Sequence, residues 1–169
     1  MPVDQQKTGP AGVPGWREGR HWANLPGMTD TPPATGTSMT GMPDITGTLL
    51  ERMGIELTVI GAERTCGTMP VAGNTQPYGL LHGGASAVLA ETLGSVAAAQ
   101  HAGPSRASVG IELNVSHHRA VREGVVTGEA RALRLGRSLA AYEITVSDDA
   151  GRRVATARLT CMILDAAPR

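Results

Sequence analysis

The sequence of 169 residues contains no phenylalanine, only two tryptophans and only two tyrosines. A hydrophobic core must therefore be built from aliphatic side chains and methionine. The same scarcity of aromatic rings argues against a protein that stacks the bases of single-stranded nucleic acid. Charge of one sign is also lacking, because 15 Lys and Arg residues balance 15 Asp and Glu residues. A balanced chain does not predict a nucleic-acid or membrane-surface partner.

Cysteine is scarce as well, since the chain has only Cys66 and Cys161. Their spacing matches no metal motif and forms no disulfide framework, which favours a reduced, cytoplasmic protein. The sequence contains no run of about 18 apolar residues and no apolar signal-peptide core, so we expect no transmembrane helix. We expect neither a metal nor a cofactor, because no motif for one is present.

Proline and glycine divide the chain into three parts. Both recur throughout residues 1–43, where neither a helix nor a strand could extend far, so this segment is predicted to be a flexible tail. Its two tryptophans, Trp16 and Trp22, leave a second interpretation open, in which the segment docks on the domain or on a neighbouring subunit. Residues 44–165 are predicted to form one domain, and residues 166–169 a short C-terminal tail.

Two helices and two strands are predicted in the first half of this domain. Asp44 is a candidate N-cap for a short helix over residues 45–53, which Gly54 would end. A long helix begins at Gly83, reaches about residue 101 and ends before Gly103-Pro104. Between the helices, two segments alternate like strands and are followed by a loop over 72–78; the strands are 55–64 and 65–71.

The hydrophobic period changes to two after the long helix, which predicts four consecutive strands over 108–118, 124–135, 138–147 and 153–164. Strands joined by short turns form an antiparallel sheet, so the fold class is α+β. The long helix is apolar on nearly every side and must be covered. A curved antiparallel sheet wrapped around a long central helix, the hotdog fold, is the simplest arrangement that covers it.

Glu91 is the one ionisable residue between Gly84 and Ala99 in the long helix. A carboxylate in apolar surroundings is costly to desolvate, and such a group can serve as a general base or a nucleophile. Ser95 lies four residues later on the same helical face, within reach of the carboxylate. The alternative is a structural glutamate that caps an element or forms an ion pair at the edge of the sheet.

His82-Gly83-Gly84 precede the same helix. The first N–H groups of a helix have no internal acceptor and lie at the positive end of its dipole, which suits a carbonyl oxygen that gains charge during a reaction. By itself a Gly-Gly pair more often marks only a turn. Gly83 and Glu91 are separated by about 12 Å along the helix axis, too far to act on one carbonyl. If both act, they come from two chains, which predicts a dimer with composite sites.

The stretch from Asn74 to Ser86, NTQPYGLLHGGAS, and the Leu89-Ala90-Glu91 that follows resemble the bacterial hotdog thioesterases of the phenylacetate group. The chain looks closest to the branch that hydrolyses 1,4-dihydroxy-2-naphthoyl-CoA and 4-hydroxybenzoyl-type CoA esters. The resemblance covers about residues 46–164 and continues through VGIELN at 109–114, the segment 117–124 and LGRS at 135–138.

This resemblance implies hydrolysis of an acyl-CoA thioester, with an aromatic acyl group favoured. Glu91 would be the nucleophile or general base, the Gly83 N–H would polarise the carbonyl, and Ser95 would assist Glu91. Gln76 and His82 would orient the thioester. The positions matching segments that contact substrate or CoA are Gly110, His117, His118, Arg119, Ala120, Arg134, Leu135, Gly136, Arg137 and Ser138.

Several alternatives stay open at this point. The fold would also suit a hydroxyacyl-thioester dehydratase with a histidine base, or a binder of acyl-CoA that does no chemistry. The arginines are compatible with an ordinary solvated face. His117 and His118 point to opposite faces of a strand and so do not predict a metal site. The sequence leaves undecided a carrier-protein thioester as substrate, the acyl group itself, and the choice between a dimer and a tetramer formed as a dimer of dimers.

Overall fold

The computed structural model of the protein describes residues 45–165. The predicted tails 1–43 and 166–169, both tryptophans and the Asp44 cap lie outside the described residues. The elements are α1 (Leu49–Met53), β1 (Glu56–Val59), β2 (Arg64–Pro70), α2 (Gly83–Ala102), β3 (Ala107–His117), β4 (Val125–Leu135), β5 (Leu139–Ser147) and β6 (Arg153–Leu164).

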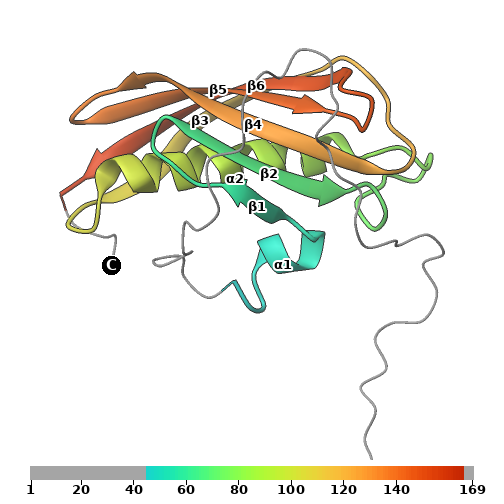
Figure 1. Ribbon diagram of the computed structural model, residues 1–169, viewed down its shortest axis with the longest axis horizontal. Helices are drawn as coiled ribbons and strands as arrows, with labels where there is room; N and C mark the ends of the chain where they lie inside the picture. The colour runs from blue at the N-terminus through green and yellow to red at the C-terminus, as the bar shows by residue number, and fades with distance from the viewer. Residues whose placement is uncertain (1–44, 166–169) are drawn as a thin grey trace, which may run out of the picture. The chain divides into compact units, whose positions relative to one another are not determined.

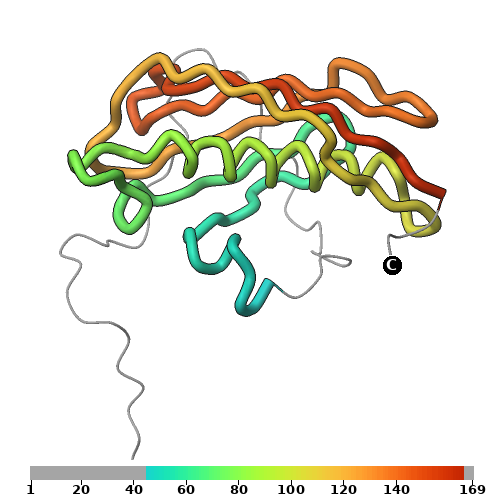
Figure 2. The backbone as a smooth tube through the Cα atoms, turned by 180° about the vertical axis from the view of Figure 1, so that it is seen from behind, coloured from blue at the N-terminus to red at the C-terminus, as the bar shows by residue number. Residues whose placement is uncertain are grey.

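The six strands form one antiparallel sheet in the order β1-β2-β4-β5-β6-β3. The long helix α2 lies along one face of this sheet and packs against β2, β3, β4, β5 and β6 (Figures 1 and 2). An antiparallel sheet curved over one long helix is the predicted hotdog arrangement, so the α+β prediction is confirmed. Within residues 45–165, no helix is long and apolar enough to cross a membrane.

The core lies between α2 and the concave face of the sheet. Alternate residues of β5 point into it, and Tyr142, Ile144 and Val146 are all buried, as their period of two predicted. On β6 the predicted inward set is also buried: Ala155, Ala157, Leu159, Cys161 and Ile163. Aliphatic burial of this kind supplies the main favourable term in folding.

Two facing glycines let α2 approach the sheet closely. Gly67 on β2 pairs with Gly128 on β4. A Cβ on Gly67 would lie 3.0 Å from Leu93 Cδ2, and a Cβ on Gly128 would lie 2.5 Å from Leu93 Cδ1. The fully buried Leu93 side chain therefore occupies the space that two side chains would otherwise fill, and this close packing fixes the helix over the middle of the sheet.

Only one side of α2 is covered completely, which corrects the prediction of a helix buried all round. The residues facing the sheet, among them Leu89, Leu93 and Ala97, are fully buried. A second stripe at helical spacing, which includes Val88, Glu91 and Ser95, is half-buried. The sheet of one chain covers one side of a helix, so this stripe stays accessible.

The short first helix and the first strand are both shorter than predicted. Gly47 has a φ of +74°, which is incompatible with a helix, so α1 begins only after Thr48, whose backbone is extended. The predicted end at Gly54 is confirmed by its left-handed φ of 65°. The first strand ends at Val59 rather than at residue 64, because the next residues turn and Gly61 bonds to the Thr65 hydroxyl.

Strand β3 is an edge strand and contains a β-bulge. Its pairing with β6 shifts register between Gly110 and Glu112, leaving Ile111 as the extra residue. Bulges re-aim the side chains that follow them. The bulge explains why Gly110 faces α2 and why Leu113, three residues later, also packs against the core. Without it, a period of two could not put both residues on one face.

Candidate functional site

The loop between β2 and α2 is held tightly against the start of α2. The Asn74 side chain donates to the carbonyl oxygens of Met53 and Pro70, each at 2.8 Å. The Gln76 N–H donates to the carbonyl of Leu80 at 2.8 Å, which closes a compact turn. These bonds place Gln76, half-buried, beside the first turn of the helix.

The first turn of α2 presents an available backbone donor. His82 is the N-cap, and its Nδ1 accepts a hydrogen bond from the Gly84 N–H at 2.8 Å. In the neutral ring, the proton therefore sits on Nε2. The Gly83 N–H has no hydrogen-bond acceptor within residues 45–165. An unpaired N–H at the positive end of a helix is suited to bind an oxygen that carries partial negative charge.

The last residue of β3 packs against this helix start. A Cβ on Gly83 would lie 3.0 Å from His117 Nε2, so any other residue at this position would push the ring away by a few tenths of an ångström. The neighbouring His118 turns to the other face, where its Nε2 lies 2.8 Å from the Thr156 hydroxyl. The two rings therefore diverge, as strand geometry predicted. No group of three or more potential metal ligands occurs among residues 45–165.

An open cavity of about 420 Å³ lies beside the start of α2. Six of the ten lining residues were candidates from the sequence: Gln76, Gly83, His117, His118, Arg119 and Ala120. The other four were not: Leu80, Leu81, Ser86 and Val154. Ser86 could have been found, because it lies three residues after Gly83 on the same helical face. Val154 could not, because it comes from a distant strand.

Glu91 does not line this cavity and lies about two turns further along α2, near the middle of the helix. It is half-buried, and its Oε1 accepts a hydrogen bond from the Ser95 hydroxyl at 3.2 Å. Its Oε2 has no hydrogen-bond partner in the described part of the chain, and none of the ion pairs there involves Glu91. One carboxylate oxygen is thus held in place while the other stays available to a water molecule or substrate.

A buried thiol lies behind this carboxylate. Cys161 pairs across the strands with Gly110, the residue whose Cα lies against Glu91. Burial, and next the negative charge of Glu91, raise the pKa of the Cys161 thiol to about 11. The thiol therefore stays protonated near neutral pH, and since the thiolate is the reactive form, Cys161 is a core residue rather than a nucleophile.

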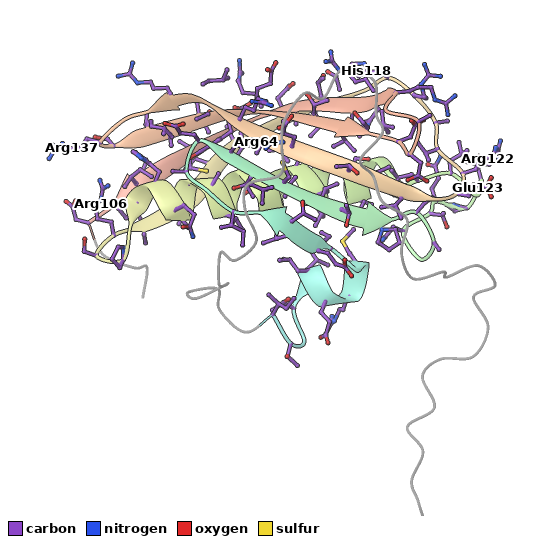
Figure 3. The ribbon with its side chains drawn as sticks, in the orientation of Figure 1. Arg64, Arg106, His118, Arg122, Glu123 and Arg137 are labelled. Atoms are coloured by element: carbon purple, nitrogen blue, oxygen red, sulfur yellow. The ribbon has the colours of Figure 1, made fainter. Side chains whose placement is uncertain are left out.

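The candidate residues 134–138, a basic run with Arg134 and Arg137, lie at the turn between β4 and β5. Gly136 N–H donates to the Leu139 carbonyl at 2.9 Å, and the Gly136 carbonyl lies 2.8 Å from His101 Nε2. Arg106 donates to the carbonyl of Arg137 at 3.3 Å. The Ser138 carbonyl accepts from Ile163 N–H. Figure 3 shows Arg106 and Arg137 at one end of the molecule and Arg122 and Glu123 at the other, with His118 at the top of the view between the two ends.

A second cavity, of about 520 Å³, opens beside this basic run. Arg134 and Leu135, both candidates from the sequence, belong to its lining. Arg64 and Arg131 line it too, and both form ion pairs with the Glu129 carboxylate. Glu63 lines the cavity as well, so Arg134, which forms no ion pair within residues 45–165, is the lining arginine best able to bind an anion such as a phosphate group.

The structure does not bring the two groups of candidates together within one chain. Gly110 contacts Glu91, whereas His117 contacts Gly83. Gly110 and His117 are seven positions apart on an extended strand, which amounts to roughly 20 Å. One chain therefore carries a carboxylate at one end of β3 and a free backbone donor at the other. The backbone donor could polarise a carbonyl and the carboxylate could activate the nucleophile that attacks it, but only if the two groups come from different chains.

Comparisons with known proteins point to one family. The sequence profile of the thioesterase superfamily matches residues 78–155. The proofreading thioesterase EntH of Cronobacter turicensis is 49% identical over 119 residues, which are 70% of this chain and 87% of that protein. Thioesterase HI1161 of Haemophilus influenzae superposes with a TM-score of 0.70 at 32% identity, covering 74% of this chain and 88% of that one. A variant of thioesterase PA1618 of Pseudomonas aeruginosa gives 0.68 at 39% identity, covering 71% and 88%.

Proposed function

Because the chain belongs to the thioesterase superfamily and is a thioester hydrolase of the hotdog fold, we propose that it cleaves an aromatic acyl-CoA at a site shared by two chains. Glu91 of one chain acts on a carbonyl that the Gly83 N–H of the other chain holds. The observation that carries this proposal is the pair of unsatisfied groups, the Gly83 N–H and Glu91 Oε2, which lie at opposite ends of one edge strand.

The free edge of β3 supports the composite site. This strand is 11 residues long, and only one of its two edges is paired within the described chain. A long unpaired edge is a template for another strand. Antiparallel pairing of two β3 strands about a two-fold axis between Leu113 and Asn114 sets Gly110 of one chain opposite His117 of the other. This pairing of the two strands also brings Glu91 of one chain towards Gly83 of its partner.

The chemistry of this site follows from its groups. The Gly83 N–H donates to the thioester oxygen, which gains negative charge as the carbonyl carbon is attacked. Glu91 either takes a proton from the attacking water or attacks directly to give an acyl-enzyme anhydride that water then cleaves. In both routes the carbon–sulfur bond breaks, the thiol leaves with a proton and the acid is released. The Ser95 bond to Oε1 directs Oε2 towards the reacting carbon.

The substrate class rests on the resemblance and on charge. The likeness to the naphthoyl-CoA and hydroxybenzoyl-CoA branch favours an aromatic acyl group. The arginines beside the second cavity, which include Arg134, suit the phosphates of CoA, and Arg137 follows three residues later in the turn after β4. An acyl group on a carrier protein is joined through the same thioester but with a single phosphate. The two substrates would therefore react in the same way and differ in the nucleotide, which only CoA carries.

A panel of thioesters tests the proposal. The purified protein is given benzoyl, hydroxybenzoyl, naphthoyl and straight-chain CoA esters, and the released thiol is followed with a thiol reagent. We expect the aromatic esters to show the highest kcat/KM. The same acyl groups on pantetheine, which lacks the nucleotide, should show a raised KM if the arginines bind CoA phosphates.

Two other outcomes would overturn the proposal. Tight binding of all the esters without release of thiol would identify a binding protein. Loss of water from a hydroxyacyl thioester that stays intact would identify a dehydratase, although the bond from Gly84 to His82 Nδ1 already commits one nitrogen of the histidine that would serve as base. No feature of the described residues favours either one over hydrolysis.

A further inference from the structure

The backbone conformation at Gly110 does not explain why this residue is a glycine. It lies within the edge strand β3, where glycine weakens a strand because it adds conformational entropy to the unfolded chain. The glycines of residues 45–165 with positive φ do not include Gly110, so its backbone conformation is open to any residue. The requirement for glycine at this position must come from space.

The space is taken by the Glu91 carboxylate. A Cβ on Gly110 would lie 2.3 Å from Glu91 Oε1 and 3.3 Å from its Cδ. Contacts below 3.0 Å essentially never occur for a Cβ, so any side chain at Gly110 would displace the carboxylate. The Ser95 hydroxyl holds the same oxygen from the helix side, and Cys161 lies beside Gly110 on the adjacent strand.

We propose that Gly110 is a positioning residue, whose missing side chain forms the seat on which the Glu91 carboxylate rests in its working orientation. This inference rests on the proposed function of Glu91, but it assigns to Gly110 a role different from contact with the substrate. The seat consists of the Gly110 Cα and the Ser95 hydroxyl, which both lie beside Glu91 Oε1.

The bulge at Ile111 is what makes Gly110 face the Glu91 carboxylate. Gly110 and His117 are seven residues apart, so regular alternation would put them on opposite faces of β3. The extra residue at Ile111 shifts the alternation by one, and both Gly110 and His117 face α2. Because of this bulge, one strand contacts both the Glu91 carboxylate, through Gly110, and the first turn of α2, through His117.

A double-mutant cycle between Gly110 and Glu91 tests the seat. In the wild-type background, Gly110→Ala is expected to lower kcat about 10²-fold with little change in KM, because a displacement of about 1 Å at a reacting group costs that much. Glu91→Asp shortens the side chain by one methylene and draws the carboxylate away from Gly110. On that background, Gly110→Ala should change kcat less than about threefold.

The control is Ser108→Ala, two residues earlier on β3, which should leave kcat within about twofold because it makes no described contact with Glu91. Equal losses from Gly110→Ala in the two backgrounds would overturn the seat, since the two sites would then act independently. Loss of activity from Ser108→Ala as large as that from Gly110→Ala would also overturn it, because any disturbance of the strand would suffice.

Thermal unfolding gives a readout that needs no substrate. Gly110→Ala should give a lower unfolding midpoint relative to its parent when Glu91 is present than when it is absent, because the new methyl group displaces the carboxylate from the Ser95 hydroxyl. In a Glu91→Ala protein the same change should leave the midpoint equal or higher, since alanine restricts the unfolded chain more than glycine does. A drop of the same size in both backgrounds would contradict the seat. This result stands even if no thioester is cleaved, so it separates this inference from the proposed function.

Discussion

Glu91→Gln is expected to lower kcat/KM for thioester hydrolysis by about 10²–10⁴-fold, the usual contribution of a general base. The amide keeps the size of the carboxylate and can still accept from the Ser95 hydroxyl, which bonds to Oε1 at 3.2 Å in the wild type. It cannot take a proton from water or attack a carbonyl. The measurement is the release of free thiol at saturating and at limiting thioester.

Glu112→Gln is the matched control for this experiment. Glu112 lies on the same strand as the Gly110 seat, but it is exposed and pairs weakly with Arg158 at 3.9 Å on the other face of the sheet. An exposed ion pair of this kind contributes little to stability. We expect unchanged activity. Retention of most activity by Glu91→Gln, with the control also active, would remove Glu91 from the mechanism.

Gly83→Pro is expected to lower kcat by about 10²–10³-fold, the loss seen when one donor to a developing oxyanion is removed. Proline has no N–H, and the first position of a helix accepts it, because its fixed φ suits the helix and no internal bond is lost there. The helix should therefore persist while its free donor disappears. Circular dichroism and the unfolding midpoint check that α2 is intact.

Gly83→Ala separates the donor from the space around it. Alanine keeps the N–H but adds a Cβ that would lie 3.0 Å from His117 Nε2, and proline adds a carbon at the same place. The difference between the two variants therefore reports the replacement of the N–H by the proline ring, apart from the Cβ that both share. We expect the alanine variant to keep at least about tenfold more activity than the proline variant. Equal activities would show that crowding of His117, and not the donor, causes the loss.

The sequence was sufficient to predict the architecture because the hydrophobic period is regular after Gly83. The burial of Tyr142, Ile144 and Val146 follows a period of two without interruption. A glycine correctly predicted the end of a helix at Gly54. The effect of a glycine was overlooked at Gly47, whose positive φ delays the start of α1, because a single glycine in a short apolar segment gives no sign of its φ.

The candidate site could be predicted in its parts but not in its arrangement. Glu91 was identifiable as a lone acid in an apolar helix, and Gly83 as a helix start without acceptors. The bulge at Ile111 was not predictable, because it shows only in the register between β3 and β6, which are distant in sequence. The same is true of Cys161 behind the carboxylate, since long-range pairing brings it there.

The relation between Glu91 and Gly83 is the central claim, and complementation between two defective chains tests it most directly. Glu91→Gln and Gly83→Pro chains carrying different affinity tags are co-expressed, and the mixed dimers are isolated through both tags. A site shared by two chains predicts one intact site per mixed dimer and about half of wild-type activity, although each parent is nearly inactive. Mixed dimers no more active than their parents would contradict the claim, because each defect would then disable the site of its own chain.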